Sequence, residues 1–146
     1  MSWQTLQPDQ LKRRFAASEL AALQRAKQDV DDAAIVTTLH DVANLVRGYV
    51  AANRINRLDV DGTIPATLVS AALDIATVAY SIAMAGFLID PKGHRKEAKD
   101  AAVKLLQDVA ANRFAIDQPD LATPPQAEQR VRPSPAVELP DSVLEV

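Results

Sequence analysis

Three long segments of this chain have apolar residues at spacings of three and four, the period of an amphipathic α-helix. The first covers residues 32–53, with an apolar stripe of Val36, Leu39, Ala43, Val46 and Val50. The second runs from Pro65 to Leu88, and its polar residues are only Thr67, Ser70, Asp74, Thr77 and Ser81. The third covers roughly residues 94–111, with a stripe of Ala98, Ala102, Leu105 and Val109. We expect three long helices, with the mostly apolar second one at the centre of the domain.

Shorter signals come before the first long segment. Pro8 occupies a first-turn position, and Leu11 and Phe15 follow at a spacing of four, which predicts a short amphipathic helix. Ser18 precedes Glu19 and an apolar pair, and it predicts the N-cap of a second short helix. The chain is therefore predicted to be all-α, a small helical bundle of two short and three long helices.

The connections between these helices contain helix caps and turn residues. Carboxylates before the first long helix favour the positive end of its dipole, at Asp29, Asp31 and Asp32. Residues 53–62 are predicted to form a loop that ends at Thr63, a helix cap two residues ahead of Pro65. Asp90, Pro91 and Gly93 interrupt the next helix, and Asn112 can adopt the left-handed conformation that ends the last one.

The last thirty residues, Asp117 to Val146, differ in composition from everything before them. They contain six of the nine prolines, and six acidic residues against two arginines. We expect a helical domain over residues 1–116, with Phe114 and Ile116 folded back onto its core, and an extended, Pro-rich, acidic C-terminal arm over 117–146. The arm's apolar residues are its expected partner-binding groups: Val137, Leu139, Val143 and Leu144.

Composition excludes several classes of chemistry. The chain has no cysteine, which rules out disulfides, thiolate nucleophiles and cysteine-ligated metals. His40 lies beside Asp41, but both fall on the polar side of an amphipathic helix, and no nucleophile stands on a strained turn. Asp59, Asp61 and Gly62 match part of a calcium loop without its remaining ligands, and turn chemistry explains them. We therefore expect no enzyme, no cofactor and no metal site.

Charge and hydropathy leave two alternatives open. The net charge of −3 divides into fourteen basic and thirteen acidic residues before 117, and two and six after it, so the chain is not a globally basic nucleic-acid binder. A basic patch could still contact an acidic neighbour or DNA: Lys92, Arg95, Lys96 and Lys99. The span from Pro65 to Ile89 is long enough to cross a bilayer, but its regular polar stripe favours a buried core helix and no membrane contact.

The order of these elements and several of their residues resemble the small helical connector proteins of tailed phages. The resemblance is closest to the family typified by a Mu phage protein, related to the head-completion adaptors of siphophages. The matching motifs cover about residues 5–116: Leu11-Lys-Arg-Arg-Phe15, Glu19-Leu20, Asp41-Val-Ala43, Gly48-Tyr49-Val50-Ala51, Ile64-Pro65, Asp74-Ile-Ala76 and the last helix to Phe114. Asn112 stands where the family usually has glycine, and the arm lies outside the resemblance.

What the resemblance implies is a structural virion protein. Its expected form is a ring of identical subunits, usually a dodecamer, located at the neck of the virion beneath the portal and assembled in the host cytoplasm. Its expected partners are itself, the portal protein and a tail or neck protein, with DNA passing through the channel without sequence-specific binding. The alternative hypothesis is a small helical nucleic-acid-binding or regulatory protein, active in DNA packaging, that uses the basic patch over residues 92–99.

Overall fold

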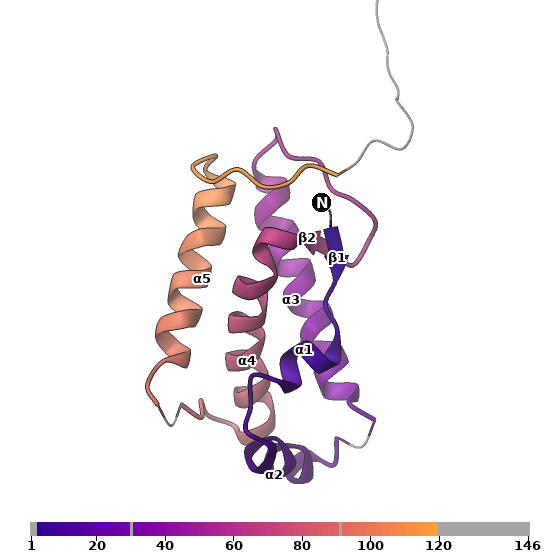
Figure 1. Ribbon diagram of the computed structural model, residues 1–146, viewed down its shortest axis with the longest axis vertical. Helices are drawn as coiled ribbons and strands as arrows, with labels where there is room; N and C mark the ends of the chain where they lie inside the picture. The colour runs from indigo at the N-terminus through magenta and orange to yellow at the C-terminus, as the bar shows by residue number, and fades with distance from the viewer. Residues whose placement is uncertain (1–2, 30, 91, 120–146) are drawn as a thin grey trace, which may run out of the picture.

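The computed structural model describes residues 3–29, 31–90 and 92–119 (Figure 1). Five α-helices make up most of the described chain: α1 (Pro8–Lys12), α2 (Ala17–Lys27), α3 (Ala33–Ala52), α4 (Val69–Ala85) and α5 (Arg95–Ala110). One short 3-10 turn (Ala66–Leu68) leads into α4, and two short strands, β1 (Trp3–Thr5) and β2 (Thr63–Pro65), form the sheet. The predicted all-α class is confirmed.

The helix α4 is the centre of the bundle. It packs against α3 on one side and α5 on another, while α1 and α2 contact it from a third direction (Figure 1). Ten of its residues are buried, including Tyr80 and Ser81, neither of which is exposed to solvent. Residues Ala66–Ala85 are long and apolar enough to span a membrane, but 61% of that window is buried inside the fold. This burial is what a core helix requires.

The predicted polar stripe on α4 does not lie in solvent along its whole length. Thr77 and Ser81 are buried. The Thr77 hydroxyl donates to the carbonyl of Leu73 at 2.7 Å, and the Ser81 hydroxyl accepts the backbone N–H of Ile89 at 2.8 Å. Because each hydroxyl has a local backbone partner, burial leaves no unpaired polar group there.

The two strands were not predicted, and one of them contains residues that were assigned to the start of a helix. β1 pairs antiparallel with β2 in the register Trp3 to Pro65, Gln4 to Ile64 and Thr5 to Thr63. Thr63 is therefore a strand residue and not a helix cap, and the α-helix begins only at Val69. Pairing with β1 gives hydrogen-bond partners to the backbone N–H and C=O groups of this extended segment.

Two other predicted helix limits were wrong. α2 begins at Ala17, with Ala16 in the N-cap position and no side-chain cap, so Ser18 lies inside its first turn. α4 ends at Ala85 and not near Leu88, because Gly86 adopts a left-handed conformation with φ of 82° and terminates the helix. The limits of α3 and α5, including the left-handed Asn112 with φ of 62°, agree with the prediction, whereas α1 ends at Lys12 and leaves Phe15 beyond it.

The last helix and the residues after it close one end of the core. In α5 the fully buried positions are Leu106 and Val109, whereas Leu105 is only partly buried. Ile116 packs into the core with 8% of its surface exposed, as predicted, but Phe114 stays 37% exposed. Residues 112–119 thus cross the end of the bundle from α5 towards β1 (Figure 1).

Polar contacts fasten the start of α3 to the core helix. Asp29 is buried and accepts two hydrogen bonds, from the Ala34 backbone N–H at 2.9 Å and from the Tyr80 hydroxyl at 3.0 Å. Burial, together with the Asp29 carboxylate, raises the pKa of Tyr80, so the phenol remains a donor. The carboxylates predicted at the α3 N-terminus therefore include one that caps this helix and holds it to α4.

Candidate assembly surface

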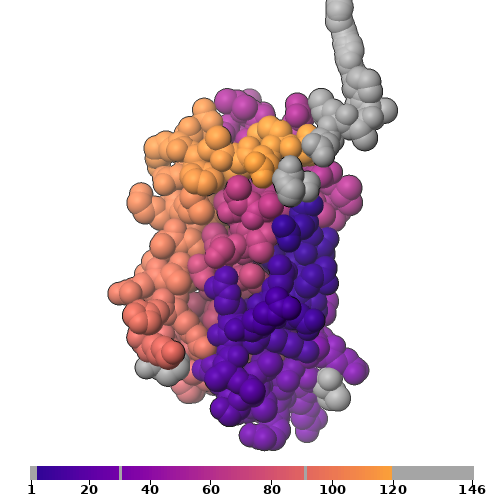
Figure 2. Space-filling view, viewed as in Figure 1, coloured from indigo at the N-terminus to yellow at the C-terminus, as the bar shows by residue number. Residues whose placement is uncertain are grey.

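One end of the molecule exposes a group of large apolar side chains. They lie on the loop between α3 and β2, where Ile55 is 69% exposed, Leu58 43% and Val60 69%. Residues 111–119 and strand β1 lie beside this loop, at the top of Figures 1 and 2. We call this surface, made of residues 53–63, 111–119 and β1, the loop end. Exposed apolar residues gathered on one surface are typical of protein–protein contact sites.

Arg47 on α3 holds the loop in one shape. Its guanidinium donates to three backbone carbonyls, those of Asp59 at 2.9 Å, Val60 at 2.9 Å and Thr63 at 2.7 Å. The same group lies 5.8 Å from the centre of the Trp3 ring, and only 11% of the Arg47 side chain is exposed. A planar fork of donors suits several carbonyls at once, so Arg47 stiffens the loop that carries the exposed apolar residues.

Amide side chains join the other half of the loop to the residues after α5. Asn53 donates to the Asn112 side chain at 3.1 Å, and Asn56 donates to the Val50 carbonyl at 3.2 Å. Gln118 donates to Asn56 at 2.9 Å and accepts the backbone N–H of Arg57 at 3.0 Å. These bonds tie α3, the loop and the segment 112–118 into one unit.

The first residues of the predicted arm belong to this unit. The Trp3 indole N–H donates to the carbonyl of Asp117 at 2.8 Å, Gln118 contacts the loop, and Pro119 is buried. Three residues beyond 116 therefore contact the body, while the division at 116 and 117 stays a prediction. The predicted anchors of the arm lie outside the described residues: Val137, Leu139, Val143 and Leu144.

The basic patch is divided by the fold. Arg95 points inward, donating to both Glu19 carboxylate oxygens at 2.7 and 2.9 Å and to the Ile89 carbonyl at 2.7 Å. Its guanidinium also lies 4.7 Å from the centre of the Phe15 ring. Hydrogen bonding from Arg95 lowers the pKa of Glu19 below its ordinary value. Arg95 therefore joins α2 to α5 and is poorly placed to contact a partner.

The three lysines of the patch remain at the surface. Lys92 and Lys96 are exposed, and Lys99 is partly buried. Lys96 forms an exposed ion pair with Asp100 at 3.0 Å. Asp90 accepts the backbone N–H groups of Arg95 and Lys96 at 3.0 and 3.1 Å, and these bonds lower the pKa of Asp90. The patch is thus a helix start with its own acidic partners, and among the described residues only the exposed Lys92 and the partly buried Lys99 of this patch have no ion pair.

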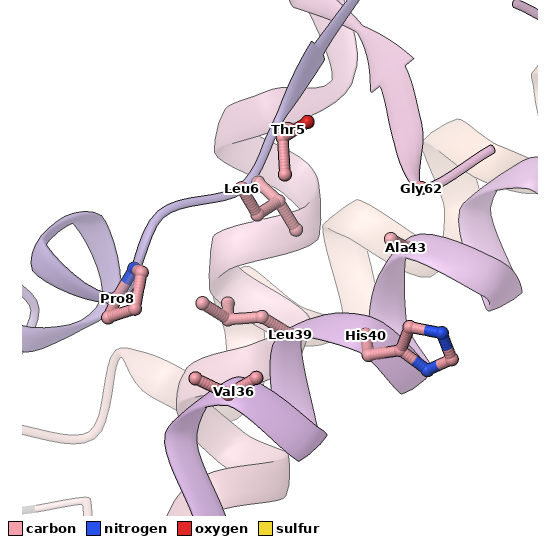
Figure 3. Close-up of a pocket in the computed structure, with 8 residues that line it drawn as sticks. All are labelled: Thr5, Leu6, Pro8, Val36, Leu39, His40, Ala43 and Gly62. Atoms are coloured by element: carbon pink, nitrogen blue, oxygen red, sulfur yellow. The ribbon is translucent and has the colours of Figure 1, made fainter. Parts of the chain in front are cut away.

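An apolar hollow lies on the side of the molecule formed by α3 and the β1–α1 segment. Its volume is about 190 Å³, and Figure 3 shows its lining: Thr5, Leu6, Pro8, Val36, Leu39, His40, Ala43 and Gly62. The sequence did not reveal it, because its walls come from three separate segments. Val36, which the helical period places on the buried stripe of α3, lines this hollow and is 52% exposed.

Comparison with known families decides where this chain belongs. Residues 6–133 match the family described as Bacteriophage Mu, Gp36. The chain is a member of the Mu Gp36 family. This identifies it as a bacteriophage protein. No curated protein and no solved structure matches the chain.

The match to the Mu Gp36 family extends further than the motifs in the sequence suggested. Those motifs ended at about residue 116, whereas the family match continues to residue 133, into the arm. The family match therefore covers nearly all of the described residues and the first part of the arm. Apart from β1, the loop end lies within the matched span.

The histidine and serine side chains that could suggest catalysis, His40, Ser70 and Ser81, each have a different local partner. His40 Nδ1 lies 3.9 Å from Asp41 Oδ1, with both side chains about two-thirds or more exposed, at 68% and 73%. Ser81 is buried and hydrogen-bonded to Ile89, and Ser70 accepts from Arg14 at 3.4 Å. Among the described residues, no three His, Asp or Glu side chains gather in a way that could hold a metal ion.

Proposed function

We propose that this Mu Gp36 family protein is a structural virion protein that joins the capsid to the tail. In this role it forms a ring of identical subunits beneath the portal, at the neck of the particle, and binds the portal and a tail or neck protein. DNA passes through the channel of the ring without sequence-specific binding. Membership of a phage family supports an association with the virion, and the exposed apolar residues of the loop end support attachment to another protein.

The single observation that carries the proposal is the rigid, apolar loop end. Ile55, Leu58 and Val60 are exposed on a loop whose shape is fixed by Arg47 and by the Asn53, Asn56 and Gln118 contacts. Burying large aliphatic side chains contributes about 1.5–3 kcal/mol each, and a preformed loop loses little entropy when it docks. A surface of this kind suits permanent attachment to a neighbouring protein.

The arm adds a second point of attachment at the same end. It starts at Asp117 beside Trp3, and its sequence is acidic and rich in proline. A segment with few apolar residues and many prolines binds best by lying along another surface. We assign Val137, Leu139, Val143 and Leu144 to that contact, which would connect the ring to the portal or to the next neck component.

Purified particles test the proposed role. The protein should co-purify with complete virions at a fixed ratio to the portal protein, and its absence from virions would refute the proposal. Particles made with the double variant Ile55→Asp and Val60→Asp should accumulate as separate heads and tails. Ala101→Asp, an exposed position on α5, is the matched control and should leave joining intact.

Removing the arm tests its part separately. A chain that stops after Pro119 keeps every described contact with the loop, so the body should fold normally. We expect head-to-tail joining to fail in this variant. Infectious particles from it would remove the arm from the proposal while leaving the loop end untouched.

A nucleic-acid-binding role is the weaker alternative. Of the basic patch, Arg95 is committed to Glu19 and Lys96 to Asp100, which leaves few cations for phosphate. A protein that binds DNA through several phosphate contacts loses affinity steeply as salt rises. The full-length protein should show little DNA binding at moderate salt, and strong salt-dependent binding abolished by Lys92→Gln with Lys99→Gln would favour this alternative.

A further inference from the structure

A second exposed apolar group lies far from the loop end, just after α4. Phe87 is 65% exposed, and Ile82, in the last turn of the helix, is 47% exposed. An aromatic ring with that much exposure on a small domain needs a reason, since most residues of this kind are buried. Leu88 and Ile89, which follow it, are both partly buried, so Phe87 is the most exposed large apolar group in this part of the chain.

The hollow beside α3 fits such a group in size and chemistry. Its volume is about 190 Å³, and aliphatic groups of Leu6, Val36 and Leu39 line it (Figure 3). An apolar cavity of roughly 150 Å³ in a protein interior can hold benzene. The benzyl side chain of Phe87 therefore fits, and the hollow has no Lys or Arg in its lining to oppose an aromatic ring.

The charges around the two features are opposite. Three lining residues of the hollow each have an aspartate next to them in sequence, and all three aspartates are exposed: Asp9, Asp41 and Asp61. The segment after Phe87 carries Lys92 at the surface and Lys96 in an exposed pair with Asp100, whereas its Asp90 accepts hydrogen bonds from the backbone of α5. Opposite charges around an apolar contact favour one orientation of docking and oppose like-to-like pairing.

The two features also face different directions. In Figure 1 the segment that joins α4 to α5 lies at the lower left, while β1, α1 and α3, which form the hollow, lie towards the right. A projecting group on one side and a matching hollow on another cannot satisfy each other within one molecule. Between copies they form a heterologous contact, which repeats from subunit to subunit and closes into a ring if the rotation allows it.

We propose that Phe87 of each subunit docks into the hollow lined by Leu6, Val36 and Leu39 of the next copy of this chain. This contact would be the subunit interface of the ring, and it rests on the ring proposed above. Lys92 and Lys96 of one copy then face Asp9, Asp41 and Asp61 of its neighbour. The partner is a second copy of the chain, and the loop end and the arm remain free for other proteins.

Paired cysteines test the contact directly, since the chain has no cysteine of its own. Virions are prepared with the double variant Lys92→Cys and Val36→Cys, which keeps the Phe87 ring in place, and treated with a short bismaleimide. We expect a ladder of covalently joined subunits up to the full ring. Each single variant should give no ladder. The matched control is Lys92→Cys with Thr37→Cys, because Thr37 is exposed beside Val36 but does not line the hollow, and no ladder is expected from it.

Two outcomes would overturn the contact. One is the absence of a ladder in particles that contain the double variant, and the other is an equal ladder from the Thr37 control. A pair of Val36→Cys and Leu139→Cys that forms the ladder instead would show that the arm fills the hollow. The amount of protein in the same virions reports on the connector role separately, so a missing ladder with normal content rejects only the Phe87 contact.

Removal of the Phe87 ring and reversal of the surrounding charges test the same contact independently. Phe87→Ala should leave the melting temperature of the isolated subunit unchanged, because the ring is exposed, and should abolish the ladder formed by the paired cysteines. Lys92→Glu with Lys96→Glu should weaken association, and Asp41→Lys with Asp61→Lys in the same chain should restore it. Association that is unaffected by Phe87→Ala would exclude the proposed contact.

Discussion

Arg95 connects three segments through one side chain. Its guanidinium bonds to Glu19 on α2, to the Ile89 carbonyl before α5 and to the Arg14 carbonyl after α1, at 3.3 Å for the last. The Glu19 and Arg95 side chains are only 16% and 17% exposed. Because both side chains are mostly buried, removing one partner leaves the other charge without a counter-charge, which lowers the free energy of unfolding more than the loss of a surface ion pair does.

Glu19→Gln should lower the free energy of unfolding at neutral pH by about 2 kcal/mol, since it leaves Arg95 without a counter-charge. The pKa of Glu19 is lowered in the folded protein, so its contribution is present above its unfolded pKa of about 4.3 and disappears as the pH falls through the folded value. The difference between wild type and variant, measured by urea unfolding, should therefore shrink below about pH 4.

Asp100→Asn is the control for this measurement. Lys96 and Asp100 are paired at 3.0 Å with side chains 71% and 57% exposed, so the substitution should change stability by less than about 0.5 kcal/mol. A loss as large as that of Glu19→Gln would mean that burial does not decide the strength of these two pairs.

At the scale of elements, the loop between α3 and β2 owes its shape to a residue outside it. Arg47 reaches the loop from α3 and bonds to three of its carbonyls. A lysine has the same charge but places a single ammonium where the guanidinium spreads its donors over a plane. The order of the loop therefore depends on the geometry of this side chain as well as on its charge.

Arg47→Lys should speed amide hydrogen exchange in residues 54–63 while leaving the helices protected, because two or three hydrogen bonds worth about 1 kcal/mol each are lost. Exchange followed by mass spectrometry measures this directly. Arg54→Lys, an exposed position on the same loop, should have no effect. Unchanged exchange in Arg47→Lys would show that the amide contacts alone hold the loop.

Gly48 lies in the middle of α3, where an added Cβ would meet nothing within 4 Å. Because glycine is a poor helix former, Gly48→Ala should stabilise the isolated subunit by about 0.5–1 kcal/mol in thermal unfolding. Gly62 has the same open surroundings but a φ of 84°, so Gly62→Ala should destabilise it. Equal effects at the two positions would contradict this account.

At the scale of the whole molecule, three residues that composition assigns to the arm contact the described body. Ile116 is buried, and Asp117, Gln118 and Pro119 contact β1 or the loop. The positions that keep the body closed therefore include residues that composition alone assigns to the arm.

Two truncations locate this boundary. A chain that stops after Pro119 should keep the melting temperature of the full protein. A chain that stops after Ala115 loses the burial of Ile116 and the Trp3 hydrogen bond to Asp117, and should be less stable by about 2–3 kcal/mol. Calorimetry of both proteins measures the difference. Equal stability of the two would place the end of the body before Ile116.

The three long helices could be predicted because their apolar period repeats over many turns, and a wrong limit at Gly86 shifts the end of α4 by only one turn. The sheet could not be predicted, since three-residue strands carry no measurable period. The role of Arg47 was equally hidden: on the helix it is one polar residue among several, and its acceptors come from a loop 12 to 16 positions away. The hollow depends on three segments meeting, which sequence spacing does not encode.

The contact between Trp3 and Asp117 joins residues 114 positions apart, at the place where the arm leaves the body. In mechanical terms, tension applied to the arm meets the contacts of Gln118, Asp117 and Ile116 in that order before it reaches α5. These contacts, to the loop, β1 and the core, must break one after another before the helix is loaded. A pull on the arm is thus resisted first at the end of the bundle, and α5 is not unwound until residues 116–118 have detached.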